Sequence, residues 1–160
     1  MSEEIHRQLI EYYEVYKETD ALYSAVAERS GMSSAMFWTM YAVCSKDGSC
    51  AQKDVCGICA MSKQTVHSAL KKLQTQGYLY LDVSPADRRS KYIFLTELGE
   101  RYKREKLYPL FEAEKAAFQQ MDQRDREGLL HGSRAYLRQL RAALRPMLAD
   151  TSANGKQGEI

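Results

Sequence analysis

Residues 62–76 combine a helical hydrophobic pattern with recognisable start and stop signals. Ser62 is a favourable N-cap, because its hydroxyl can accept a hydrogen bond from an amide of the first turn. Gly77 follows the last apolar position, where a left-handed residue commonly ends a helix. Spacing of three and four residues puts the apolar side chains on one face, so the pattern predicts an amphipathic helix. These apolar residues are Val66, Leu70 and Leu73.

Helical spacing also predicts helices on both sides of this segment. Pro109 lies inside one of them, so we expect a kink near Tyr108, where proline interrupts the hydrogen-bond ladder. Residues 149–160 are small and polar and are expected to be disordered. The additional helices cover residues 3–30, 33–45, 52–59, 96–121 and 122–148.

Strand-like composition occurs in three short stretches. Aromatic and β-branched residues are frequent in residues 78–83 and 91–95, which predicts a hairpin. Residues 84–90 are polar and would form its turn. Residues 50–51 would add a short first strand. The predicted order is helix, helix, short strand, helix, helix, hairpin, helix, helix.

This order is that of a winged helix-turn-helix protein, a mainly α fold with a small sheet (α+β). We expect residues 33–99 to form the winged lobe, with a recognition helix at residues 62–76 and a wing at residues 78–95. The flanking segments 1–32 and 100–148 carry more apolar surface than such a lobe needs. Their helices are therefore expected to form a dimerisation domain with a second chain.

Positive charge is concentrated in the recognition helix and the wing. The net charge is +2, but residues 61–95 hold six basic and two acidic residues, whereas residues 1–60 hold five basic and nine acidic ones. Contacts to phosphates provide most non-specific affinity for DNA, and a helix of this width fits the major groove. We therefore expect binding to double-stranded DNA. A winged helix used only for protein contacts is the alternative, and steep weakening of binding with salt would distinguish DNA binding from it.

Two motifs in this region resemble the MarR family of bacterial transcription regulators. They are Asp87-Arg88-Arg89 in the wing and Leu95-Thr96-Glu97-Leu98-Gly99 after it. The resemblance implies a homodimer joined by its terminal helices, whose two recognition helices, about one DNA turn (~34 Å) apart, read an inverted-repeat operator. It also implies that Arg89 enters the minor groove in an orientation held by Asp87, while Arg88 contacts a phosphate.

The polar face of the recognition helix supplies the candidate DNA contacts. The amide of Gln64 can pair with an adenine edge, and Thr65 can offer hydroxyl or methyl contacts. Lys71 and Lys72 lie farther along the helix and are expected to meet phosphates. His67 could be a pH sensor or a ligand, but on a polar face we interpret it as a DNA contact or simply exposed. The candidates are Ser62, Lys63, Gln64, Thr65, His67, Ser68 and Lys72.

Aromatic residues on the first two helices suggest a possible effector site. In the MarR family, small phenolic or lipophilic effectors bind where these helices meet the fifth, and aromatic walls with hydroxyl tips suit such ligands. Tyrosines at helical spacing can equally belong to a core or a dimer interface. The candidate residues are Tyr12, Tyr16, Trp38 and Tyr41.

Cys44, Cys50, Cys56 and Cys59 fall within sixteen residues. A metal site or a thiol redox switch is the alternative function that they suggest, with Cys56 and Cys59 as a C-x-x-C pair. The pair is expected on a helix rather than in a metal-binding knuckle. Buried free cysteine behaves as a small hydrophobe, so we interpret the four as core residues and expect no metal and no cofactor.

The sequence holds no catalytic motif, and we expect no targeting segment. G-x-S-x-G, H-E-x-x-H and a phosphate-binding glycine loop do not occur, so an enzyme is not expected. The first residues are acidic and amphipathic, and no run of about 18 apolar residues occurs, so we expect a cytoplasmic protein without a membrane partner. The prediction is a homodimeric repressor that binds an inverted-repeat operator and is released by a small effector. The alternative is a metal- or thiol-responsive regulator.

Overall fold

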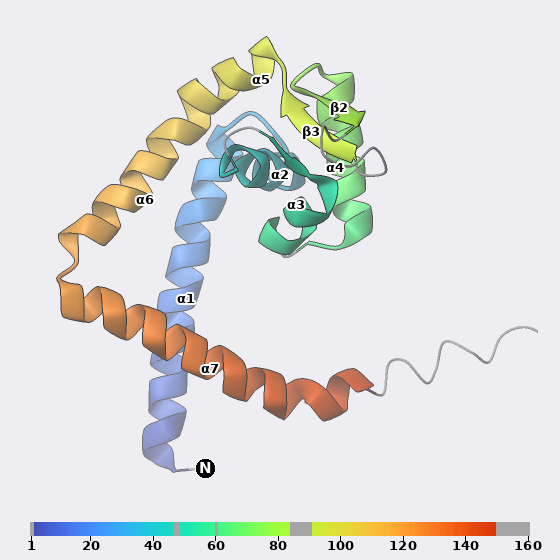
Figure 1. The fold of residues 1–160 in the computed structure, drawn as a ribbon. Coiled ribbons are helices and arrows are strands. Elements are labelled where there is room, and N and C mark those ends of the chain that lie inside the picture. The colour runs from blue at the N-terminus through green and yellow to red at the C-terminus, as the bar shows by residue number, and fades with distance from the viewer. Residues whose placement is uncertain (1, 47–48, 60, 84–90, 150–160) are drawn as a thin grey trace, which may run out of the picture. The chain divides into compact units, whose positions relative to one another are not determined.

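The computed structural model describes residues 2–46, 49–59, 61–83 and 91–149 (Figure 1). The predictions for Asp87, Arg88 and Arg89, and for the tail beyond Ala149, lie outside these residues. The helices are α1 (Glu3–Arg29), α2 (Ser34–Cys44), α3 (Gln52–Cys59), α4 (Lys63–Thr75), α5 (Glu97–Tyr102), the π-helical turn η1 (Lys103–Leu107), α6 (Tyr108–Gln120) and α7 (Gln123–Ala149). The strands are β1 (Ser49–Ala51), β2 (Leu79–Val83) and β3 (Lys91–Leu95).

The three strands form an antiparallel sheet in the order β1-β3-β2. Ile93 sits at its centre, opposite Cys50 of β1 and Leu81 of β2. The central strand β3 is therefore the last of the three in sequence. The predicted winged helix-turn-helix fold is confirmed.

The core lies between the sheet and helices α2, α3 and α4. Apolar side chains from all of these elements are fully buried, and Leu107 of η1 joins them. Complete burial of a Leu or Phe side chain contributes about 1.5–3 kcal/mol, so this cluster dominates the stability of the lobe. The largest fully buried apolar side chains are Phe37, Met40, Leu70, Leu73, Leu79, Ile93 and Leu107.

The helix after the wing changes its winding immediately before proline. The sequence predicts a kink near Tyr108; there the structure places η1, whose last turn closes with the amide of Tyr108 donating to the carbonyl of Lys103. Pro109 has no N–H to continue the regular ladder. A π-helical turn inserts one extra residue at such an interruption. The irregularity expected near Tyr108 therefore takes the form of this π-helical turn.

Residues 1–111 and 112–160 form two compact units, which we describe separately. In the second unit, Asp122 caps α7 by accepting a hydrogen bond of 2.8 Å from the amide of Asp125. The guanidinium of Arg126 donates to the carbonyls of Phe118 and Met121, at the end of α6. None of the described helices is both long and apolar enough to cross a membrane.

Candidate nucleic-acid interface

Hydrogen bonds define both ends of the recognition helix α4. At its start, Ser62 Oγ accepts a hydrogen bond of 3.1 Å from the amide of Thr65 and lies 2.8 Å from the Thr65 hydroxyl. At its end, Gly77 has a φ of 76°, and the amide of Tyr78 donates to the carbonyl of Leu73 at 3.0 Å. This is a Schellman motif, whose left-handed residue is usually glycine. The predicted cap at Ser62 and the predicted stop at Gly77 are confirmed.

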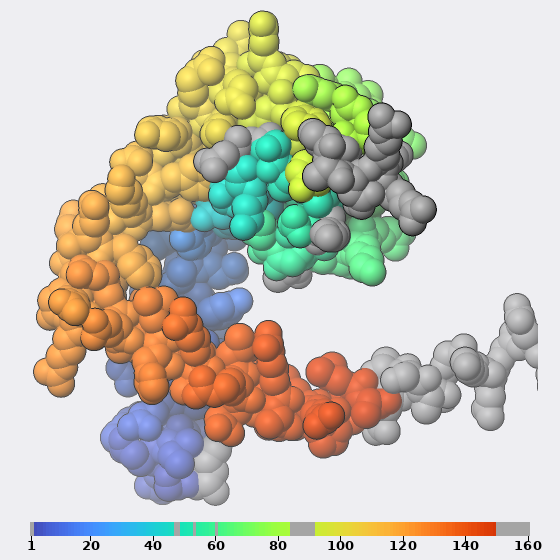
Figure 2. All heavy atoms as spheres, in the orientation of Figure 1, coloured from blue at the N-terminus to red at the C-terminus, as the bar shows by residue number. Residues whose placement is uncertain are grey.

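One face of α4 is buried and the opposite face is a polar ridge. The buried residues are Val66, Ala69, Leu70 and Leu73. The ridge consists of Gln64, Ser68, Lys71 and Thr75, which recur every three or four residues and are all exposed. α4 (green) forms part of the surface of the lobe in the space-filling view (Figure 2). The ridge therefore offers amide, hydroxyl and ammonium groups to a partner.

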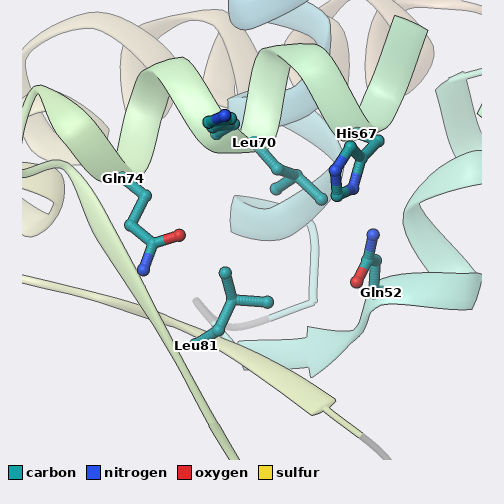
Figure 3. Close-up of a pocket in the computed structure, with 6 residues that line it drawn as sticks. Gln52, His67, Leu70, Gln74 and Leu81 are labelled. Carbon is teal, nitrogen blue, oxygen red and sulfur yellow. The ribbon is translucent and has the colours of Figure 1, made fainter. Parts of the chain in front are cut away.

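The seven candidates of the recognition helix are all exposed, but they do not all line one groove. Thr65 and Lys72 line a groove of about 360 Å³ that α4 forms with Ser33 and Met36 at the start of α2. His67 lines a groove of about 300 Å³ on the other flank, with Gln52 of α3 and Leu81 of β2 (Figure 3). Gln64 and Ser68 of the ridge also line the groove beside α2, and Lys71 lines the groove beside α3 and β2, so the ridge forms part of both grooves.

The two strands of the wing leave the lobe beside α4. Across them, the rings of Tyr80 and Phe94 are stacked with their centres 5.4 Å apart, which stiffens the hairpin. The tip, with Asp87, Arg88 and Arg89, lies outside the described residues, so the roles of these three side chains stay predictions.

Comparison with known proteins identifies this lobe. Residues 30–90 match a MarR family model. Over these residues the winged helix is similar to the MarR family. None of the curated proteins compared with the sequence matches it. The family model ends at residue 90, so it covers α2, α3, the recognition helix and β2.

Solved structures, two of them of MarR family regulators, share the fold over most of the chain. A regulator from Streptomyces coelicolor in complex with DNA is 15% identical with a TM-score of 0.68, covering 88% of this chain and 93% of its own. A regulator from Neisseria meningitidis is 22% identical with a TM-score of 0.66, covering 90% and 98%. BpsR of Bordetella bronchiseptica, whose DNA binding is regulated by 6-hydroxynicotinic acid, is 22% identical with a TM-score of 0.58, covering 84% and 98%. These similarities establish the fold.

The aromatic residues predicted as an effector site occupy two different environments. Trp38 and Tyr41 of α2 are half-buried, and their ring centres lie 5.3 Å apart. The ring centre of Tyr23 in α1 lies 5.6 Å from that of Trp38, and the ring centre of Phe111 in α6 lies 5.0 Å from that of Tyr41. Tyr12 and Tyr16 lie on the exposed N-terminal part of α1, where Tyr12 contacts Tyr13. The structure therefore groups Trp38 and Tyr41 with Tyr23 and Phe111.

The cysteines contribute to the packing of α2, β1 and α3. Burial raises the pKa of the Cys44 thiol to about 12 and the pKa of Cys50 and Cys59 to about 11. These thiols are therefore protonated near neutral pH, whereas metal binding and redox chemistry require the thiolate. Cys59 Sγ donates to the Trp38 carbonyl at 3.2 Å, and Cys56 is half-buried. Within the described ranges, no group of three or more His, Cys, Asp or Glu side chains could hold a metal ion.

Sequence reasoning missed polar residues that the fold adds to the interface. Thr75 completes the ridge of α4, and the helical spacing from Gln64 onwards could have identified it. Ser33, Gln52 and Gln74 line the flanking grooves, but Ser33 and Gln52 come from other elements. Their position depends on how α2 and α3 pack on α4, which no local pattern contains.

Proposed function

We propose that this protein is a transcriptional regulator that binds double-stranded DNA through α4 and the wing and has no catalytic activity. The observation that carries this proposal is the exposed ridge of α4, which holds amide, hydroxyl and ammonium groups and no carboxylate. Gln64 and Ser68 suit base edges in the major groove. Lys71 and Lys72 suit the phosphates on either side. The MarR family match of the same segment supports this reading.

The proposed assembly is a homodimer joined by α1 and the C-terminal helices. Large apolar side chains are exposed along α1, and Leu22 is 72% exposed. The described residues of α7 include no buried one, although Leu130, Leu137 and Leu144 follow a heptad-like spacing. Apolar surface on such a scale commonly marks an interface. A two-fold dimer would present two α4 helices to an inverted-repeat operator and repress transcription by occupying it.

The proposed release signal is a small aromatic or lipophilic effector bound near Trp38 and Tyr41, with Tyr12 and Tyr16 contributed by the exposed part of α1. An effector that binds one dimer shape more tightly would shift the spacing of the two lobes away from the operator. The regulation of BpsR by 6-hydroxynicotinic acid is consistent with an aromatic effector.

Salt dependence tests the DNA-binding proposal without knowledge of the operator. Anisotropy of a labelled 30-base-pair duplex of random sequence would be measured with the full chain at increasing NaCl. The double variant Lys71→Ala/Lys72→Ala should lower the slope of log affinity against log salt by about two per protomer, because each phosphate contact contributes about 0.9. Lys106→Ala/Lys115→Ala removes the same charge outside the interface and should keep the wild-type slope. Absence of salt-dependent DNA binding by the wild type would favour the alternative, a winged helix used only for protein contacts.

A further inference from the structure

The C-terminal helix α7 carries a stripe of arginines. Four arginines recur at spacings of four, three and four residues, so they lie on one face of the helix, and all four are exposed. They are Arg134, Arg138, Arg141 and Arg145. Residues 128–149 contain no acidic residue, which gives this part of α7 a net charge of +4. The ion pairs found within the described residues do not include these arginines, so the stripe has no counter-ion there.

The N-terminal part of α1 carries the opposite charge. Residues 3–20 contain six acidic and two basic residues, a net charge of −4. Glu11, Glu14 and Glu18 recur at helical spacing and are all exposed. Over the described ranges, no ion pair includes these three glutamates. They form an acidic face on α1, as the arginine stripe forms a basic face on α7.

Exposed apolar side chains accompany the charges on both helices. On α1, Val15 lies four residues after Glu11 and three before Glu18, and it is 61% exposed. On α7, Arg141 lies four residues after Leu137, which is 46% exposed. Residues three or four apart are neighbours on a helix surface, so each face combines apolar contact with one sign of charge. Such a face suits a partner that offers apolar contact and the opposite charge.

We propose that the arginine stripe of α7 binds the acidic face of α1 in a second copy of this chain, so that two unlike helices pair twice across a two-fold axis. The net charges of +4 and −4 are equal and opposite, and a two-fold interface repeats the same contact in both directions. The inference rests on the homodimer of the proposed function. It adds which helix pairs with which, and it makes charge the reason why the partner is a copy of this chain.

Charge excludes the other ways of covering these helices. Pairing α7 with the α7 of a partner would bring two arginine stripes together, and pairing α1 with α1 would bring two acidic faces together, and like charges across an interface repel. An anionic lipid surface would neutralise α7, since a basic amphipathic helix suits such a surface. It would leave the acidic face of α1 uncovered. A second copy of the chain covers both faces.

Charge reversal in the full chain tests this pairing. Single ion pairs at the edge of an interface contribute little, whereas reversal turns attraction into repulsion along the whole stripe. Sedimentation equilibrium at about 50 mM NaCl, where screening is weak, measures the dimer Kd. The acidic-α7 variant is Arg138→Glu/Arg141→Glu/Arg145→Glu. The basic-α1 variant is Glu11→Lys/Glu14→Lys/Glu18→Lys.

Each variant alone should dimerise roughly tenfold or more weakly than the wild type, because both of its helix pairs then repel. An equimolar mixture of the two should form a one-to-one heterodimer of near wild-type Kd, since every α1 then meets an α7 of opposite charge. The chain with all six substitutions should again form a homodimer. The matched control reverses three exposed charges on α4 and should dimerise like the wild type; it is Lys63→Glu/Lys71→Glu/Lys72→Glu.

Wild-type dimerisation of the acidic-α7 variant alone would overturn the proposed pairing, because it is the result expected when like helices pair. Recovery in the chain with six substitutions but not in the mixture would also overturn it, since the pairing would then lie within one chain. Vesicle binding by the wild type (phosphatidylcholine with phosphatidylserine) that the acidic-α7 variant loses, with an unchanged dimer Kd, would assign the stripe to lipid instead. A monomeric wild type would overturn the proposed homodimer together with this inference. Circular dichroism establishes that each variant is folded.

Discussion

The hydroxyl of Thr96 donates a hydrogen bond of 2.5 Å to the carbonyl of Gly77, nineteen residues earlier in the chain. The same oxygen accepts a hydrogen bond of 3.2 Å from the amide of Gly99 and so caps α5. The amide of Thr96 also donates to the carbonyl of Tyr78 at 3.1 Å. Gly77 ends the recognition helix, so one threonine connects the end of α4 to the start of α5. This explains physically why threonine occupies this position of the L-T-E-x-G motif.

Thr96→Ala should lower the free energy of unfolding by about 1–2 kcal/mol, because it removes a helix cap and leaves the Gly77 carbonyl without this donor. Thr96→Ser keeps the hydroxyl and should recover most of the loss. Urea denaturation followed by circular dichroism measures both. Equal stability of the alanine variant and the wild type would show that the bond between Thr96 and Gly77 contributes nothing.

Gly99 is needed for the close approach of α5 to the turn after α4. A Cβ atom there would overlap the Tyr78 carbonyl oxygen and press on the Leu95 side chain. Gly99→Ala should therefore destabilise the protein by roughly 1–3 kcal/mol or more, since the obstructing atom is backbone. Gly57→Ala is a matched control in α3, where a Cβ would meet no atom within 4 Å, and it should be neutral or stabilising by up to about 1 kcal/mol. Equal melting temperatures for the two variants would contradict this account.

The helix ends were predictable from sequence because their causes are local. Ser33, Ser62 and Thr96 each cap a helix through a bond to an amide three residues later, and Gly77 adopts the left-handed conformation. Such signals occupy four or five consecutive residues. The apolar pattern similarly identified the buried face of α4.

Long-range arrangements were not predictable in the same way. The contact of Trp38 with Tyr23 and the bond from Thr96 to Gly77 join segments that only the folded chain brings together. The division of the polar residues of α4 into a ridge and two flanks depends on where α2, α3 and β2 pack. The sequence therefore indicated that His67 is exposed but not that Gln52 faces it.

Stability should fall between about pH 9 and 11, partly because of Cys44. Burial raises the pKa of its thiol from 9.0 to about 12, so in this range the unfolded chain loses a proton that the folded chain retains. The folded state then binds more protons, and ionisation favours unfolding as pH rises. Cys44→Ala should be less stable at pH 7 because of the lost packing, but its stability should decline less steeply from pH 9 to 11. Parallel declines in urea titrations of the two proteins would contradict the raised pKa.

Two changes on α4 should separate base contacts from phosphate contacts. On a selected duplex, Gln64→Ala should weaken binding by about 1–3 kcal/mol and relax the preference at one base pair of each half-site. Lys72→Ala should weaken binding to selected and unrelated duplexes by similar factors and lower the salt slope by about one. Competition titrations with single-base-pair variants of the site measure both effects. A change of sequence preference in the lysine variant would reverse these two assignments.

The most direct test of the central claim is selection of bound duplexes from a random pool by the full chain. The account predicts an enriched inverted repeat whose half-sites are centred about 10–10.5 base pairs, one helical turn, apart. Light scattering of the same complex should give two chains per duplex. Recovery of duplexes without any common sequence, or of a single half-site bound by one chain, would contradict the proposal that this protein reads its operator as a dimer.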